Sequence, residues 1–410
     1  MIKEQAMKVK VTEALNKKST IGNDIELNKY NDSDEARIKS TDELSKEAKE
    51  SLEFVGIELK ESDEPRSATF VQVDNNAIEI KVKHDVPLEL MSTGDAAKKH
   101  PELVEKYWWK AIDPSTDKYT ARVALEEEKG YFIHVKAGKK IKAPIQSCLF
   151  IGSEEQLQRS HNIVIVEEDA ELNIISGCSS DPNVESGAHL GMSEFYVEKG
   201  GKLSFTMIHD WGENVVVRPR TVAIVGENGQ YLSNYISLDK VKDVQMNPLT
   251  RLVGKGATAR LNSIVVAPNG SHSDIGGRAI LEVEGTRAEV IARSISTGGT
   301  IINRGLLRAE AENVRAHLEC NGLMLNKKGR IYAVPELDAH VGNAELSHEA
   351  AVGRISPEEI EYLMARGLSE EEATATIVRG FLNVNIEGLP ESLAKKINST
   401  LDAFTYNKGM

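Results

Sequence analysis

At 410 residues the chain is long enough for one elongated domain with accessory pieces, or for two domains. Its net charge of −13 argues against nucleic acid as a partner, because phosphate binding requires a cationic surface. No stretch approaches the roughly 20 apolar residues that a membrane helix needs, and three cysteines are too few for a disulfide framework. We therefore expect a soluble protein of the reducing cytoplasm that binds neither nucleic acid nor membrane.

The N-terminal region, residues 1–119, is predicted to consist of helices and one β-hairpin. Residues 1–62 are highly charged and poor in aromatic side chains. Within them, Ser40 to Phe54 has a helical pattern in which Ser40 or Thr41 is an acceptable N-cap. We expect the helices of this segment to be loosely attached to the rest of the chain.

Two further elements are expected before the central region. Ala68 to Val82 alternates between apolar and polar side chains around an Asn-Asn turn, a pattern that predicts a hairpin. Pro101 to Lys110 predicts a short helix. We interpret its paired Trp108 and Trp109 as packing anchors rather than as residues that stack on a ligand.

The central region, residues 120–346, is predicted to be a β domain. Short strands recur, each ended by Gly, Asn or Asp, and helical periodicity is nearly absent. The segments VEEDAELNII, VEGTRAEVIA and AEAENVRAHLE repeat a strand, an acidic or Asn turn, and a strand. Stacked β-rungs have this pattern, because each rung buries its inner face only against its neighbours. The irregular rung lengths leave a β-sandwich open as the alternative.

The C-terminal region, residues 347–410, is predicted to be helical. Ser356 begins a capping box with proline at the first helical position, and Ser369 begins a second capping box. Gly367 is expected to stop the first helix, and a third helix is predicted from Pro390 to Phe404. The apolar faces of these helices require a cover, which can be the chain's own β domain or a partner protein. They are formed by Ile360, Leu363, Met364, Ala373, Ile377, Val378 and Phe381.

The stretch from Cys320 to Glu349 contains the strongest candidates for chemistry. It ends in the adjacent pair His348 and Glu349, and a thiolate, an imidazole and a carboxylate make a plausible ligand set for iron or zinc. The separation is too long for a compact zinc motif, and a lone buried cysteine is more often a core residue than a ligand. His317 precedes Cys320 by three residues, which on a strand places the two side chains on opposite faces. We interpret Cys148 as a core residue.

Motifs of common enzyme classes are absent from the sequence. No GxxxxGK[ST] phosphate-binding loop exists, so the chain is not expected to hydrolyse ATP itself. No GxSxG elbow and no HExxH helix is present. GKGATA (Gly254–Ala259) fits a dinucleotide-binding pattern, but alternating strand residues follow it rather than a helix, which indicates a turn. We expect a protein without catalytic activity of its own.

Several motifs between Ile302 and Leu382 resemble the C-terminal third of the SufB/SufD family, the scaffold proteins of iron–sulfur cluster assembly. They are NRGLL (Asn303–Leu307), AVPELD (Ala333–Asp338), SHEAAVGRI (Ser347–Ile355), RGLSEEEA (Arg366–Ala373) and IVRGFL (Ile377–Leu382). The interval from Cys320 to Glu349 also agrees with that between cysteine and glutamate in SufB-type members. SufD-type members usually lack this cysteine, so the resemblance, which extends more loosely back to about Glu102, places the chain nearer SufB.

This resemblance implies a mainly β fold, in which a parallel β-helix lies between an α-helical N-terminal region and a C-terminal α-helical domain. It implies a scaffold that assembles a transient iron–sulfur cluster, expected to be [4Fe-4S], on Cys320, His348 and Glu349. The cluster would then pass to apo iron–sulfur proteins. A SufD-like structural subunit that carries no cluster is the alternative within the family. A solenoid enzyme acting on polysaccharide is a third interpretation, which the low aromatic content of 5% disfavours.

The resemblance also implies a SufC-type ABC ATPase as partner, which binds the ATP and docks on the C-terminal helices. The expected docking residues are Ile360, Leu363, Met364, Ile377 and Phe381. ATP-driven closure of that partner would reshape a β-helix dimer and expose Cys320. Because an ABC ATPase works as a pair of subunits, two docking sites are needed. We predict a homodimer through the last rungs, with a SufD-like subunit as the alternative second chain.

Three residues form a candidate sulfur relay. Cys178 resembles the cysteine that SufB is thought to use in receiving sulfur and passing it along the β-helix interior. His209 and Trp211 lie where the family has a polar residue and a tryptophan. At Phe150 and Gly152, however, bacterial members carry an arginine and an asparagine, and His209 replaces a glutamine. Direct supply of sulfide is therefore an alternative to the relay.

Overall fold

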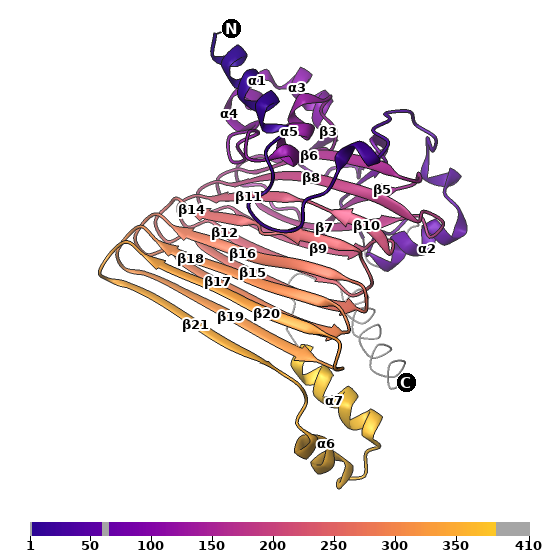
Figure 1. Cartoon of the computed structure of the whole chain (residues 1–410). Coiled ribbons are helices and arrows are strands. Elements are labelled where there is room, and N and C mark those ends of the chain that lie inside the picture. The colour runs from indigo at the N-terminus through magenta and orange to yellow at the C-terminus, as the bar shows by residue number, and fades with distance from the viewer. Residues whose placement is uncertain (1, 60–64, 383–410) are drawn as a thin grey trace.

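The computed structural model describes residues 2–59 and 65–382, and in it the chain winds into a parallel β-helix (Figure 1). One side of this solenoid, here named the first wall, is a ten-stranded sheet whose neighbours are all parallel except β1 and β2. In spatial order its strands are β2 (Asn76–Val82), β1 (Ala68–Val73), β5 (Ile145–Ile151), β7 (Glu171–Ser180), β9 (Lys202–Asp210), β12 (Gln230–Ser237), β15 (Thr258–Pro268), β17 (Arg287–Thr297), β19 (Val314–Met324) and β21 (Ala344–Gly353).

The opposite side, named the second wall, is an eleven-stranded sheet in which only β3 and β4 are antiparallel. Pro219 lies between β10 and β11, and Pro248 lies between β13 and β14. The strands are interrupted there because proline has no N–H to donate to the neighbouring strand. In chain order the strands are β3 (Glu89–Ser92), β4 (Tyr131–Val135), β6 (Gln156–Val166), β8 (Ser186–Val197), β10 (Asn214–Val217), β11 (Arg220–Val225), β13 (Asp243–Met246), β14 (Leu249–Leu252), β16 (His272–Leu281), β18 (Thr300–Ala309) and β20 (Arg330–Ala339).

Tight turns connect the two walls and explain the repeated sequence pattern. Asp169, Asn228 and Asn313 have φ values of 56°, 53° and 57°, and short polar side chains tolerate this left-handed conformation best after glycine. Gly254 meets a different need, since a Cβ there would collide with the backbone of Glu227 in the adjacent turn. The repeated strand–turn–strand motif therefore corresponds to stacked parallel rungs, and the β-sandwich alternative is not formed.

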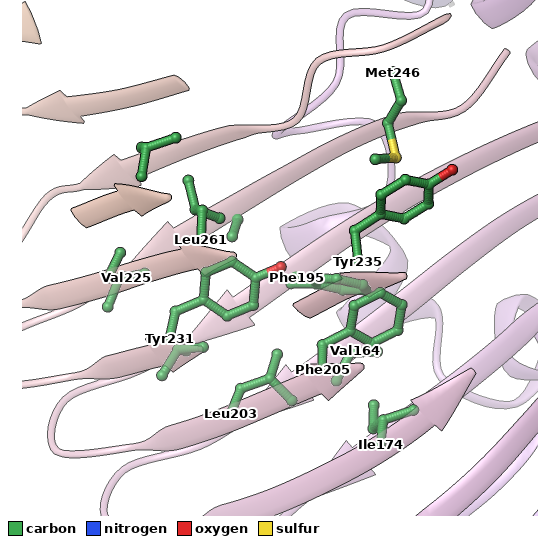
Figure 2. Close-up of a cluster of buried hydrophobic side chains, with 14 of the residues drawn as sticks. Val164, Ile174, Phe195, Leu203, Phe205, Val225, Tyr231, Tyr235, Met246 and Leu261 are labelled. Atoms are coloured by element: carbon green, nitrogen blue, oxygen red, sulfur yellow. The ribbon is translucent and has the colours of Figure 1, made fainter. Parts of the chain in front are cut away.

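Apolar layers inside and outside the first wall stabilise the solenoid. The inner core fills the space between the walls and includes Phe195, Phe205, Tyr231, Tyr235 and Leu261 (Figure 2). A second layer, named the outer cluster, covers the outside of the first wall. It contains Cys148 together with Ile208, Ile236, Ile264, Ile295 and Leu323. Burial of Cys148 in this layer confirms its interpretation as a core residue.

Helices and short turns cover the start of the solenoid. They are α1 (Ile2–Ala14), the 3-10 turns at Leu27–Lys29 and Thr41–Glu43, α2 (Lys46–Phe54), α3 (Thr93–Lys99), α4 (Pro101–Tyr107) and α5 (Lys118–Leu125). Ser45, rather than Ser40 or Thr41, caps α2, because its Oγ accepts a hydrogen bond from the Ala48 N–H. Ala48 and Leu52 are fully buried in the outer cluster. The expected loose attachment is therefore wrong for α2.

The tryptophan pair follows α4 and anchors it to the second wall. The Trp108 ring lies 5.5 Å from that of Phe132, and the Trp109 ring stacks 4.0 Å from that of His161. His161 is fully buried, with Nδ1 2.8 Å from Glu128 Oε2 and Nε2 2.8 Å from Glu194 Oε2. Glu194 also accepts hydrogen bonds from the backbone N–H groups after α4. The prediction of packing anchors is thus confirmed.

Two helices follow the last strand, α6 (Pro357–Met364) and α7 (Glu370–Leu382) (Figure 1). Ser356 Oγ accepts from the Glu358 N–H, and Gly367 adopts a φ of 98° after α6. Ser369 and Glu372 form the second capping box, in which each side chain accepts a hydrogen bond from the other residue's N–H. The predicted helix from Pro390 to Phe404 lies outside the described residues.

The β-helix extends beyond the expected range of 120–346 in both directions. The predicted hairpin is formed by β1 and β2, and β1 joins the first wall by pairing in parallel with β5. At the other end β21 continues to Gly353, so the boundary at 346 falls inside a strand. None of the helices in the described ranges has the length and apolar character required to cross a membrane.

Candidate functional site

Cys320 and His348 lie on the last two strands of the first wall and point to the same side. β19 and β21 pair in parallel, with Leu318 opposite His348 and Cys320 opposite Ala350. Side chains alternate across a strand, and Leu318 and Cys320 are both fully buried in the inner core. The register therefore places His348 on the inward face, diagonally across from Cys320.

Glu349 lies on the other face of the same strand. It pairs with Glu319, whose position between Leu318 and Cys320 directs it outward, and it is exposed. His317 also points outward, where its Nδ1 lies 2.8 Å from Ser347 Oγ, as the odd spacing from Cys320 predicted. The structure thus brings Cys320 and His348 together and separates Glu349 from both by the thickness of the strand.

Burial sets the protonation state of the candidate thiol. Cys320 has no exposed surface, and burial, with a smaller contribution from the Glu319 charge, raises the pKa of its thiol to about 11. The thiol is therefore protonated at neutral pH. Because metals bind the thiolate, ligation has to displace this proton.

The described part of the chain does not contain a complete metal site. In residues 2–59 and 65–382 no three His, Cys, Asp or Glu side chains are arranged to hold a metal ion. His348 Nε2 is buried and has no hydrogen-bond partner there, so its lone pair or proton is unused. Within the described residues, one protomer therefore offers a thiol and an imidazole on one face.

These two residues lie at an open end of the solenoid. Among the described residues, β20 and β21 are the terminal strands of their walls. Large apolar side chains are exposed there: Tyr332 by 50%, Leu337 by 44% and Val352 by 40%. An unpaired strand edge beside exposed apolar side chains favours association with another chain.

A second cluster, named the interior cluster, surrounds Cys178 inside the solenoid. Cys178 on β7 lies directly opposite His209 on β9. The His209 ring is 5.5 Å from that of Trp211, and His209 Nδ1 lies 3.0 Å from the Tyr235 hydroxyl. Trp211 also packs 5.1 Å from the ring of His189. The three predicted relay residues are therefore adjacent to one another.

Burial keeps the interior cluster uncharged. It raises the pKa of the Cys178 thiol to about 12, and it lowers the pKa of His209 well below its usual range. It also lowers the pKa of His189 to about 3, and His189 Nδ1 lies 2.8 Å from Gln158 Oε1. The proton therefore stays on the Cys178 thiol, and the neutral His209 has an Nε2 without a hydrogen-bond partner among the described residues.

His189, Gln158 and Tyr235 belong to this cluster and were not found from the sequence. They lie on β8, β6 and β12, so their proximity depends on the register of several rungs. Within SGAHLGMSEF, the alternation of a strand provides a weak signal that one face is inward. It does not identify which residues of other rungs lie beside His189.

The expected docking residues of the C-terminal helices fall into two groups. Leu363 and Ile377 line a groove of about 520 Å³ between α6 and α7, and Met364 is 43% exposed. Ile360 is half-buried on α6. Phe381 instead packs against the outer cluster, with its ring centroid 5.9 Å from the Arg293 guanidinium. Of the expected docking residues, those on α6 and in the groove are therefore available to a partner, whereas Phe381 packs against the wall.

Arg293 connects Phe381 to the strand of Cys320. It forms an ion pair with Glu319, and Glu319 Oε1 also accepts a hydrogen bond of 2.6 Å from the Asn321 side chain. Both partners of Arg293 lie on the outer face of the first wall. Helix α7 and Cys320 therefore contact opposite faces of the same part of the wall.

Comparison with known proteins identifies the family. A family model described as "SUF system FeS cluster assembly, SufBD core domain" matches residues 149–381, more than half of the chain. The chain belongs to the SufB/SufD family. The SufBD match extends from β5 to α7 and includes Cys178, His209, Trp211, Cys320 and His348.

Curated relatives cover nearly the whole chain. An iron–sulfur cluster assembly SufBD family protein of Archaeoglobus fulgidus is 49% identical over 354 residues, which are 86% of this chain and 94% of the relative. Another from Methanothermobacter thermautotrophicus is 42% identical over 401 residues, 96% of this chain and 97% of the relative. The iron–sulfur cluster assembly protein SufB of Bacillus subtilis is 30% identical over 381 residues, 91% of this chain and 81% of the relative. Membership of this SUF-system assembly family agrees with the resemblance.

Proposed function

We propose that this SufB/SufD protein is a SufB-type scaffold on which an iron–sulfur cluster, expected to be [4Fe-4S], is assembled before transfer to apo-proteins. The observation that carries the proposal is the inward-facing pair of Cys320 and His348 at the open end of the solenoid. A cysteine and a histidine suit iron, and fewer thiolates than in a Cys₄ site favour release of the cluster. The reducing cytoplasm would keep the thiol available.

A homodimer would complete the ligand set. An isologous two-fold contact brings each terminal edge against its own copy, so two Cys320 thiols and two His348 imidazoles would share one interface. Pairing of the β20 and β21 edges would also cover Tyr332, Leu337 and Val352. The exposed Glu349 carboxylates lie on the outer faces, and joining the cluster would require local rearrangement.

A SufC-type ABC ATPase is the proposed source of that rearrangement. The groove between α6 and α7 and the exposed Met364 provide a surface for it, and no ATP site is proposed on this chain. Closure of two ATPases on a dimer would move α6 and α7, and thereby open the protected Cys320. Sulfur would arrive either through Cys178, His209 and Trp211 or as sulfide supplied directly.

The alternative is a SufD-like subunit that docks the ATPase and carries no cluster. The presence of Cys320 favours the SufB role, because a purely structural subunit has no need of a thiol at the interface. The two roles differ in one measurable property, namely the iron and acid-labile sulfide held after anaerobic reconstitution.

The deciding experiment compares Cys320→Ser with Cys148→Ser after reconstitution with ferrous iron and sulfide. Both substitutions change one sulfur atom to oxygen in a fully buried side chain, so they are matched for volume and burial. Cys320→Ser should lose the cluster absorbance and the bound iron, and Cys148→Ser should keep both. Equal iron and sulfide in the two variants would exclude Cys320 as a ligand.

The mass of the intact complex tests the homodimer. The scaffold with its ATPase should contain two copies of each chain. A SufD-like protein supplied as competitor should not displace the second copy. Preferential one-to-one pairing with the SufD-like protein would contradict the homodimer.

A further inference from the structure

The positions of the three cysteines leave a gap in any path of sulfur through the solenoid. Cys148 faces the outer cluster, whereas Cys178 and Cys320 face the inner core. Cys178 on β7 and Cys320 on β19 are five strand spacings apart, about 24 Å at the usual separation of strands. Direct exchange between cysteines requires two sulfur atoms in contact. Sulfur that reaches Cys320 from inside the solenoid must therefore cross most of this distance as a small free molecule.

A cavity of about 40 Å³ occupies this part of the interior. Tyr235, Ser263 and Ala292 line it, and they are the register partners that lead from β12 through β15 and β17 to Cys320 on β19. Ala292 lies directly opposite Cys320, so the cavity ends one strand away from the thiol. Since about 10–15 Å³ is enough for one water molecule, the cavity has room for a molecule of that size.

The lining combines apolar surface with a few weak hydrogen-bonding groups. Figure 2 shows Tyr231 and Tyr235 on one strand of the inner core, with Met246 beside Tyr235. Ser233 and Ser263 point inward yet are only half-buried, because they border the cavity. The Tyr235 hydroxyl is shared with His209 of the interior cluster. The cavity thus borders Tyr235, which contacts His209 of the interior cluster, and Ala292, which lies opposite Cys320.

The charge of the lining selects a neutral molecule. The one charged residue that borders the cavity is Arg304. Its Nε donates a hydrogen bond of 2.5 Å to Asp274 Oδ1, and its Nη2 donates one of 3.0 Å to Asp274 Oδ2. An anion inside would therefore lose its hydration without gaining an ionic partner. A small neutral molecule that forms weak hydrogen bonds and contacts methionine and aromatic side chains is suited to the site.

We propose that this cavity binds hydrogen sulfide and supplies it to Cys320. This inference rests on the proposed function, because it assumes that a cluster is built at Cys320. Binding breaks and forms no covalent bond, and the molecule enters in its neutral form. Thr221, Pro248 and Arg304 border the cavity at the second wall and are partly exposed, at the break between β13 and β14. This break is the proposed entrance.

The first test measures occupancy and does not depend on cluster assembly. Crystals of the full chain would be soaked anaerobically in sodium sulfide, and the sulfur located by anomalous scattering. The wild type should show a sulfur peak between Tyr235 and Ala292. Ala292→Leu, which fills the cavity, should show none, and Ala292→Ser should retain the peak. A wild-type cavity that holds water alone would overturn the proposal.

The second test measures the rate at which acid-labile sulfide is incorporated from inorganic sulfide and ferrous iron. Because the larger side chain overpacks the cavity and leaves no room for a small molecule, Ala292→Leu should slow incorporation by about tenfold or more. Ala292→Ser and Cys148→Ser are the controls, and a thermal melt shows that each variant is folded. A folded Ala292→Leu protein with the wild-type rate would overturn the inference alone. Loss of the proposed function would instead be seen as undiminished assembly in Cys320→Ser.

Discussion

The buried state of Cys320 predicts an unusually slow reaction with alkylating reagents in the isolated chain. The pKa of its thiol is about 11, against an ordinary value of 9.0. Only the thiolate reacts, so between pH 7 and 8 its population should be about 100-fold smaller than that of an exposed cysteine. Complete burial of the side chain adds a steric barrier, which makes this factor a lower limit.

Iodoacetamide labelling followed by peptide mass spectrometry measures this reaction. A cysteine introduced by Lys327→Cys, at an exposed position between β19 and β20, provides a reference in the same molecule. The Cys320 rate should rise about tenfold for each pH unit until about pH 11, whereas the reference should level off near pH 9. Glu319→Gln should raise the Cys320 rate, because the Glu319 charge contributes to the high pKa. Addition of the ATPase with ATP should raise it further.

Two outcomes would refute this reasoning. Cys320 labelling at pH 7.5 within about tenfold of the reference would mean that the thiol is neither buried nor protonated in solution. A Cys320 rate that levels off near pH 9 would mean that the protein does not raise its pKa. Either result would contradict the proposal that a partner has to open the site.

Two further predictions concern the ends of the solenoid. Burial alone would lower the pKa of His161, but Glu128 and Glu194 raise it to about 9. The charge on His161 therefore stabilises the fold fully below about pH 6.5, and this contribution is lost as the pH rises through 9. Urea unfolding followed by tryptophan fluorescence should show that His161→Gln costs about 3 kcal/mol more at pH 6 than above pH 9.5, and a cost independent of pH would contradict a charged His161. At the other end, Met364→Asp should abolish binding of the ATPase in a pull-down without changing the melting temperature. Phe381→Asp should lower the melting temperature, because it places a charge in the outer cluster. Retained ATPase binding by Met364→Asp would exclude the exposed face of α6 as the docking surface.

The sequence pattern predicted a β domain because its turn signals are local, and the resemblance to the SufB/SufD family decided for a parallel β-helix over a sandwich. Each Asp or Asn turn, such as those at Asp169 and Asn313, repeats the same change of direction, and stacked rungs follow from the repetition. The N-cap signals at Ser356 and Ser369 are equally local, and both helices begin there, with a reciprocal capping box formed only at Ser369 and Glu372. The expected loose attachment of α2 was wrong because the few apolar residues of that helix are all on the face that the solenoid buries.

The candidate site depends on register, which a single sequence with irregular rungs does not specify. A shift of one residue between β19 and β21 would have placed Glu349, rather than His348, on the side of Cys320. For the same reason the proximity of His189 and Tyr235 to the relay residues could not be deduced. The sequence therefore identified Cys320, His348 and Glu349 as candidates. Only the pairing of β19 and β21 showed that Cys320 and His348 lie on the inner face of the wall and Glu349 on the outer face.

The ion pair between Arg293 and Glu319 has a mechanical consequence for Cys320. At this point the wall of the solenoid is a single strand thick, and Glu319 and Cys320 are consecutive residues on its two faces. Phe381 of α7 packs against Arg293. A movement of the C-terminal helices would therefore act on the outer face of the first wall, next to the Cys320 thiol. A displacement of Glu319 on the outer face would therefore be transmitted to Cys320 on the inner face through a single peptide bond.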